Sequence, residues 1–194
     1  MGILKVVRHA QSMSNNHHPG VTVDRHNYLT KTGINQAIDL GEQLVNEGFV
    51  PDIIWSSTIP RAYQTSMILL SIMNHPCEIG LSDNIAEMKW NPNGEYITED
   101  KMKILFGADH IDNISKKLDH YAHPEGERQI DVYNRVSGFF ETHIRQLLKD
   151  NKNVIIVCHY FVVRALVSHI ETNSANQMTS ISPKNCSPFT FEIN

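Results

Sequence analysis

The sequence is poor in cysteine, with only three among its 194 residues. Cys77, Cys158 and Cys186 form no Cys-x-x-Cys pair and are odd in number, which argues against both a disulfide framework and a zinc site. Such sparse, unpaired cysteine is typical of proteins kept in a reducing compartment. We therefore expect a cytoplasmic protein.

Long apolar runs are also missing, because no stretch approaches the roughly 18 consecutive apolar residues of a membrane-spanning helix. The apolar run near the N-terminus is too short for the hydrophobic region of an export signal, and it ends at Arg8-His9. The sequence therefore predicts no export signal and no membrane partner.

Nor does the chain carry an excess of positive charge, since 17 lysines and arginines face 21 acidic residues and the formal net charge is −4. A protein of this charge has no global attraction for nucleic acid or an anionic membrane, although a local basic pocket is compatible with it. Repeats, low-complexity tracts and a convincing linker are absent as well. With 41% apolar and 20% charged residues, the composition indicates one globular domain spanning residues 1–194.

The chain does contain short, apolar, strand-like runs that alternate with segments of helical periodicity. Thr30 is placed to cap a helix that Gly48 ends, and Pro60 suits the first turn of the next helix. Nearly continuous apolar strands between helices are typical of a buried parallel sheet. We predict an α/β fold, a three-layer α/β/α sandwich around a mostly parallel sheet, with strands at 3–7, 53–55, 153–158 and 189–193 and helices at 31–47, 60–74, 127–148 and 161–170.

The stretch from Glu78 to His123 is less regular and contains Trp90, Pro92 and Gly107. Long irregular segments in a compact domain are usually functional lids or disordered. We interpret residues of about 78–124 as an insertion with short helices that forms a cap on the substrate side of the active site.

Polar side chains directly follow three of the predicted strands, namely Arg8 and His9, residues 56–61 with Arg61, and His159. The carboxyl ends of parallel strands share one edge of a sheet, so these side chains should lie close together. Arginine forks suit an oxyanion such as phosphate, and histidine can act as a nucleophile or as an acid and base. Without a carboxylate cluster for a metal, this set indicates phosphoryl transfer that relies on fixed cations and needs no cofactor.

Several segments of the chain also match, in order, a known set of motifs. Residues 8–15 resemble R-H-G-E-S-x-x-N, and residues 29–37 resemble L-T-x-x-G-x-x-Q-A. Residues 56–65 are similar to S-S-x-x-x-R-A-x-Q-T, residues 124–127 to P-x-G-E, and residues 158–166 to S-H-G-x-V-x-R-A-L. These are signatures of the histidine phosphatase (phosphoglycerate mutase-like) superfamily, which the chain resembles over most of its length.

The resemblance implies catalytic roles for His9, Glu87 and His159. His9 would attack phosphorus and become phosphohistidine, while Arg8, Arg61 and His159 would hold the phosphoryl oxygens. Glu87 falls where the family places an acidic residue after a short strand, and it would protonate the leaving oxygen and then activate water. Nearby cations should also disfavour a protonated His9.

Asn15 and Tyr160 complete the phosphate site that the resemblance implies. Asn15 would add a hydrogen bond to phosphate. Tyr160 and Phe161 stand where the family has small residues, so their backbone N–H groups could face phosphate while their side chains narrow the pocket. Ala10 likewise replaces a glycine and adds one methyl group beside the nucleophile.

Two sets of residues leave alternatives open. Asp83, Glu95 or Glu99 could supply the acid in place of Glu87, because exposed glutamates are common. Trp90 and Tyr96 either line the mouth of the substrate pocket or only pack the insertion.

The remaining histidines invite a metal or phosphate site. For the adjacent pair His17 and His18, no acidic or cysteine partner lies at useful spacing, so we expect solvated side chains and no metal. We also favour solvated side chains for His110, His120 and His123, although they could meet a substrate phosphate.

Three functions are compatible with these residues. We favour a phosphatase that hydrolyses a phosphomonoester of a small metabolite through a phosphohistidine intermediate. A phosphoglycerate mutase is the alternative, but the family's mutases are typically longer, with a bigger insertion that closes over the site. A catalytically weak relative that binds a phosphorylated ligand or a protein is the third, motivated by Tyr160 and Phe161. The expected partner is a small phosphorylated substrate, and a homodimer is compatible with the sequence.

Overall fold

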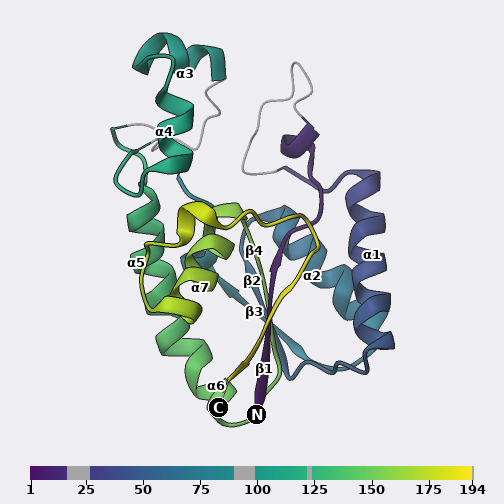
Figure 1. Cartoon of the computed structure of the whole chain (residues 1–194). Helices are drawn as coiled ribbons and strands as arrows, with labels where there is room; N and C mark the ends of the chain where they lie inside the picture. The colour runs from purple at the N-terminus through teal and green to yellow at the C-terminus, as the bar shows by residue number, and fades with distance from the viewer. Residues whose placement is uncertain (17–26, 90–98, 122–123, 194) are drawn as a thin grey trace.

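A central sheet of five strands organises the molecule (Figure 1). The computed structural model describes residues 1–16, 27–89, 99–121 and 124–193. The strands follow the order β3-β2-β4-β1-β5, and only the pairing of β5 with β1 is antiparallel. Their bounds are Gly2–Arg8 for β1, Ile53–Ser57 for β2, Glu78–Ser82 for β3, Val154–Cys158 for β4 and Phe189–Ile193 for β5.

Helices cover both faces of the sheet, which confirms the predicted three-layer α/β/α fold (Figure 1). On one face, α1 (Lys31–Asn46) and α2 (Pro60–Met73) enclose a core with Val7, Ile54 and Ile155. On the other, α5 (Gln129–Phe139) and α7 (Tyr160–Thr172) pack over the alternate residues of the same strands, including Val6 and Ile156. All five residues of β4 are buried, as expected for a central strand.

The residues predicted to begin or end the first two helices, Thr30, Gly48 and Pro60, do so in the structure. Thr30 caps α1, and its hydroxyl oxygen accepts a hydrogen bond from the Gly33 N–H at 3.0 Å. Gly48 follows the helix with a φ of 67°, a conformation that favours glycine. Pro60 begins α2, where its missing N–H costs nothing.

The long helix predicted at 127–148 is interrupted. It begins at Gln129 as α5, passes through a π-helical turn (η3, Phe140–Ile144) and ends as α6 (Arg145–Lys149). Phe139 and Phe140 are both buried, although adjacent residues of an α-helix point about 100° apart. A π turn adds one residue to the helix and so re-aims the side chains that follow it.

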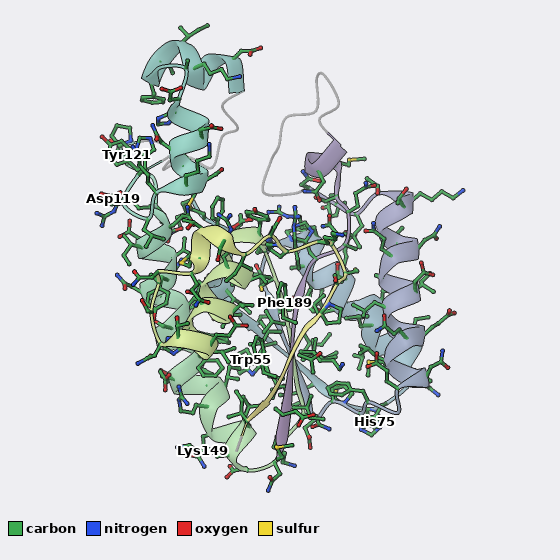
Figure 2. All side chains as sticks on the ribbon, in the orientation of Figure 1. Trp55, His75, Asp119, Tyr121, Lys149 and Phe189 are labelled. Atoms are coloured by element: carbon green, nitrogen blue, oxygen red, sulfur yellow. The ribbon has the colours of Figure 1, made fainter. Side chains whose placement is uncertain are left out.

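The insertion predicted from residue 78 begins later than expected. Glu78–Ser82 forms β3, which pairs in parallel with β2 at the edge of the sheet. Figure 2 labels Trp55, which belongs to β2. Gly80 of β3 leaves room for the Trp55 ring, because a Cβ at Gly80 would lie 2.7 Å from that ring. The interpretation of residues 78–82 as part of the insertion was therefore wrong, since the partner strand rather than the local pattern makes them a strand.

The part of the insertion that the structure describes contains α3 (Glu99–Phe106) and α4 (His110–Lys116). Both helices lie beyond the end of the sheet at which β1 ends (Figure 1). The side-chain amide of Gln129 donates to the Ile114 carbonyl at 2.7 Å and so fixes α4 to the start of α5. Within the described residues, no helix is long and apolar enough to cross a membrane.

Candidate active site

The two histidines that follow strands lie side by side. The His9 N–H donates to the Cys158 carbonyl at 2.9 Å, which joins the carboxyl ends of β1 and β4. His159 follows Cys158 directly, and the centroids of the His9 and His159 rings are 5.1 Å apart. The sheet edge therefore brings the two histidines together, as the topology predicts.

Hydrogen bonds fix the tautomer of His9. Its Nδ1 lies 2.7 Å from the Ala10 carbonyl, which can only accept, so Nδ1 carries the proton. Its Nε2 accepts a hydrogen bond from the Arg61 Nε at 3.0 Å and therefore presents a lone pair. A neutral imidazole whose Nε2 lone pair faces a cation is poised for attack on a phosphoryl group that the cation binds.

Burial and charge keep His9 neutral. His9 is only 2% exposed, and this burial, followed by the nearby Arg61 and Arg8 charges, lowers its pKa well below 6.5. The pKa of His159 is also lowered well below 6.5, first by burial and then by Arg61 and His9. The expected effect of the cations on His9 is thus present, and burial is the larger cause.

His159 is oriented by Ser57. The Ser57 hydroxyl oxygen accepts the Ile59 N–H at 3.2 Å, so its proton is available to the His159 Nε2 at 2.8 Å. When the Ser57 hydroxyl donates to Nε2, the proton of the neutral His159 ring sits on Nδ1. This atom is buried and has no hydrogen-bond partner among the described residues, so it can donate to an oxyanion.

The two arginines supply fixed positive charge. Arg61 is 8% exposed and lies in the first turn of α2. Arg8 ends β1, and its Nη1 donates to the Pro183 carbonyl at 3.0 Å, while its buried Nε has no partner among the described residues. Burial lowers the pKa of both guanidinium groups from 12.5, yet arginine stays protonated in proteins.

Glu87 lies at the start of α7. Its carboxylate accepts hydrogen bonds from the backbone N–H groups of Tyr160 at 3.1 Å and Phe161 at 3.3 Å, and also from its neighbour Met88. The structure thus places the Glu87 carboxylate at the N-terminus of α7, which directly follows His159, and its role as the acid stays a prediction. The N–H of Tyr160 donates to the Glu87 carboxylate. A contact from this N–H to phosphate therefore stays a prediction, and phosphate would have to displace the carboxylate from it.

Asn15 and Asp83 form hydrogen bonds within the protein, and Glu99 lies in a helix of the insertion. The Asn15 Oδ1 accepts the Ser12 N–H at 3.0 Å and closes the turn after His9, so its phosphate contact also stays a prediction. Asp83 accepts a hydrogen bond from Thr58, and Glu99 begins α3. Glu95 lies outside the described residues.

The motif at residues 29–37 supports the loop that follows His9. Gly33 in α1 approaches the backbone of that loop so closely that a Cβ would lie 2.0 Å from the Gln11 carbonyl oxygen. The Gln36 side chain accepts the Gln11 N–H at 2.9 Å, and the Thr30 N–H donates to the Gln11 carbonyl at 3.0 Å. The motif at residues 29–37 therefore serves the active site by holding this loop.

Sequence reasoning missed two residues that hold the backbone of His9 and Ala10. The Asn185 side chain donates to the His9 carbonyl at 2.6 Å, and the Thr65 hydroxyl accepts the Ala10 N–H at 3.1 Å. Thr65 lies within a recognised motif, which was a usable signal. For Asn185, which is 176 residues from His9, no local pattern pointed to this contact.

One histidine of the insertion, His110, differs from expectation. His110 is 4% exposed, stacks on Phe106 and lies 3.0 Å from a ring nitrogen of His120, so the prediction of a solvated His110 was wrong. Among the described residues, no group of three or more His, Cys, Asp or Glu side chains could hold a metal ion. Outside the described residues lie His17, His18, Trp90, Tyr96 and His123.

A match to a family model establishes the family of this chain. The model of the histidine phosphatase superfamily (branch 1) matches residues 4–194. This chain belongs to that superfamily. Among curated histidine phosphatase relatives, a 2,3-bisphosphoglycerate-dependent phosphoglycerate mutase of Methanosarcina acetivorans is 29% identical, over 98% of this chain and 91% of the relative.

Solved histidine phosphatase structures share the fold. The α-ribazole phosphatase from Shigella flexneri superposes with a TM-score of 0.79 at 21% identity, covering 99% of this chain and 91% of that one. A mycobacterial glucosyl-3-phosphoglycerate phosphatase gives a TM-score of 0.77 at 18% identity, covering 97% and 90%. At these identities the similarity establishes the fold alone.

The buried neutral histidines predict a pH-dependent stability. Because the folded pKa values of His9 and His159 lie below the ordinary 6.5, the unfolded state binds more protons as the pH falls below that value. The free energy of unfolding should therefore fall below pH 6.5, by at most about 1.4 kcal/mol per pH unit for each histidine. Urea titrations at pH 7.5, 6.5 and 5.5 test this, and His159→Gln should have a shallower dependence. An equal slope in the variant would contradict it.

Proposed function

We propose that this histidine phosphatase superfamily member is a phosphatase that hydrolyses a phosphomonoester of a small metabolite through a phosphohistidine intermediate. The observation that carries the proposal is the neutral His9 ring, whose Nε2 lone pair faces the Arg61 guanidinium at 3.0 Å in a buried site. A nucleophile of this kind needs cations that offset the charge of the phosphoryl oxygens, and Arg8 and Arg61 supply them.

In the first step, the His9 Nε2 would lose the hydrogen bond from the Arg61 Nε and form a bond to phosphorus, while the bond from phosphorus to the leaving oxygen breaks. Arg8, Arg61 and the His159 Nδ1–H would hold the phosphoryl oxygens, and protonated Glu87 would give its proton to the leaving oxygen. A phosphoryl group at the start of α7 would compete with Glu87 for the N–H groups of Tyr160 and Phe161. This competition would release the carboxyl group toward the leaving oxygen.

In the second step, Glu87 takes a proton from water, the water oxygen attacks phosphorus, and the bond from phosphorus to His9 Nε2 breaks. Inorganic phosphate forms, and both side chains return to their starting protonation states. Every proton is carried by residues of the chain, so the proposed cycle consumes only the ester and water.

A phosphoglycerate mutase is the second candidate, because curated relatives at 28–29% identity carry that name. The alignment with the Methanosarcina protein spans 232 positions, whereas this chain has 194 residues, so the relative contains segments that this chain lacks. A shorter chain has less material to exclude water from a phosphohistidine, which favours hydrolysis over return of the phosphoryl group to substrate.

Hydrolysis of p-nitrophenyl phosphate at pH 5 to 8, with chelator present, tests the proposal. We expect turnover that chelator does not reduce, and strong inhibition by chelator would contradict the metal-independent mechanism. Phosphorus NMR of 3-phosphoglycerate with catalytic 2,3-bisphosphoglycerate separates the candidates. Release of inorganic phosphate from either ester supports the phosphatase, whereas interconversion of phosphoglycerates without release supports the mutase.

A further inference from the structure

The Tyr160 ring lies against two guanidinium groups. The central carbon of Arg8 is 5.2 Å from the centroid of the ring, and that of Arg164 is 4.7 Å from it. Tyr160 is the first residue of α7 and stands where the superfamily signature has glycine. The ring therefore adds a contact to Arg8 that a glycine could not make.

Arg164 anchors one side of this stack. Its Nε, Nη1 and Nη2 atoms all donate to acceptors of the surrounding structure, so the group has a fixed place. The acceptors are the carbonyls of Ile181 at 2.7 Å, Thr179 at 3.1 Å and Ser115 at 3.2 Å, and the Gln129 side chain at 3.3 Å. Because Arg164 is fixed, its contact with the Tyr160 ring also fixes the position of that ring.

Arg8 is held much less firmly by hydrogen bonds. Only its Nη1 donates to a described acceptor, the Pro183 carbonyl at 3.0 Å, and its buried Nε has no partner among the described residues. Stacking on an aromatic ring uses the face of a guanidinium group and leaves the N–H groups at its edge available. Contact with Tyr160 can therefore orient Arg8 without consuming the donors that phosphate needs.

From this arrangement we infer that the Tyr160 side chain is a positioning residue, which acts through Arg8 to hold one guanidinium edge toward the phosphoryl oxygens. The inference rests on the proposed function in so far as phosphate is the ligand. It assigns to the Tyr160 ring a role in ground-state phosphate binding that is separate from any contact made by its backbone N–H. Tyr160 replaces the glycine of the family signature, and its ring would thereby contribute to the phosphate site.

Calorimetric binding of inorganic phosphate to the full chain tests the inference directly. Loss of a partly desolvated cation–π contact corresponds to about a three- to tenfold weaker affinity, which we expect for Tyr160→Leu. Tyr160→Phe keeps the ring and should bind within about twofold of wild type. Tyr133→Leu is the matched control, because Tyr133 is a helical tyrosine that contacts His169 rather than the site, and it should bind phosphate as wild type does.

Kinetics and a double-mutant cycle exclude a merely structural effect. For p-nitrophenyl phosphate, Tyr160→Leu should raise KM three- to tenfold while kcat changes less than about threefold. In an Arg8→Met background, Tyr160→Leu should weaken phosphate binding no further. If Tyr160→Leu does not fold, Tyr160→Met, which also lacks a ring, takes its place.

Wild-type affinity in the variant without the ring, or a Phe variant as weak as the Leu variant, would overturn the inference. A weakening of equal size in the Arg8→Met background would also overturn it. A wild type that binds phosphate but turns over no ester would instead contradict the proposed function and leave the binding comparison intact.

Discussion

Exchange of His9 for alanine should nearly abolish phosphomonoester hydrolysis, with kcat falling by about 10⁴- to 10⁶-fold. Loss of a covalent nucleophile removes the route through the enzyme-bound intermediate, and the remaining cations can only bind the substrate. The fold should survive, because His9 follows the end of β1 and its ring lies beside His159 at the edge of the sheet, outside the strand segments that build the core. Steady-state rates with p-nitrophenyl phosphate and thermal unfolding monitored by circular dichroism measure both expectations.

His75→Ala is the control, since His75 is an exposed histidine after α2, and it should retain the wild-type rate. Brief reaction with a substrate labelled with radioactive phosphorus should leave an acid-labile label on wild type and none on His9→Ala. Retention of more than about a tenth of the wild-type rate in His9→Ala would exclude the covalent mechanism. An acid-stable label would exclude phosphohistidine.

Exchange of Glu87 for glutamine should slow hydrolysis according to the leaving group. An alkyl phosphate needs its leaving oxygen protonated, so its rate of phosphoenzyme formation should fall by about 10²- to 10⁴-fold. Nitrophenolate leaves without a proton, and phosphoenzyme formation from p-nitrophenyl phosphate should fall by less than about tenfold. Rates of phosphoenzyme formation with glycerol phosphate and p-nitrophenyl phosphate, measured by rapid quench, provide the comparison.

Asp83→Asn is the matched control for this prediction, because Asp83 was a candidate acid but bonds to Thr58 in the structure. Its rates with both substrates should stay within about twofold of wild type. Equal losses for good and poor leaving groups in Glu87→Gln would point to another acid. A larger loss in Asp83→Asn than in Glu87→Gln would identify Asp83 as that acid.

The elements that sequence reasoning predicted well are those whose signals are local. Thr30 and Gly48 bracket α1, and the continuous apolar run of β4 needs no partner to be recognised. The same holds for the site's strand-end residues, because parallel strands expose their carboxyl ends at one edge whatever the strand order. His9 and His159 could therefore be placed together without knowledge of the register.

The elements that were missed depend on distant partners. Glu-Ile-Gly-Leu-Ser of β3 has no clear alternation, and its glycine is required by the Trp55 ring of the neighbouring strand. The extra residue of the π turn at Phe140–Ile144 leaves no mark on a helical periodicity. Both features are set by packing, which a single sequence does not display.

Within the site, the missing information was likewise long-range. Glu87 was predicted as an acid, but nothing local indicated that its carboxylate would accept the first N–H groups of α7. Asn185 contacts the His9 carbonyl from the segment that leads into β5, and its sequence neighbours are ordinary loop residues. Residue types could be predicted here, whereas hydrogen-bond partners could not.

The position of β1 in the sheet has a consequence for biosynthesis. Its two neighbours are β4 and β5, which come from the other end of the sequence, whereas α1, β2, α2 and β3 follow one another locally. Contacts between distant segments form slowly, and unpaired apolar strands are exposed to aggregation until their partners arrive. During synthesis on the ribosome, neither edge of β1 can form its hydrogen bonds until β4 and β5 have been made. The candidate active site is then completed late in folding, and a stalled chain would carry His9 without the buried, cationic surroundings that it has in the folded protein.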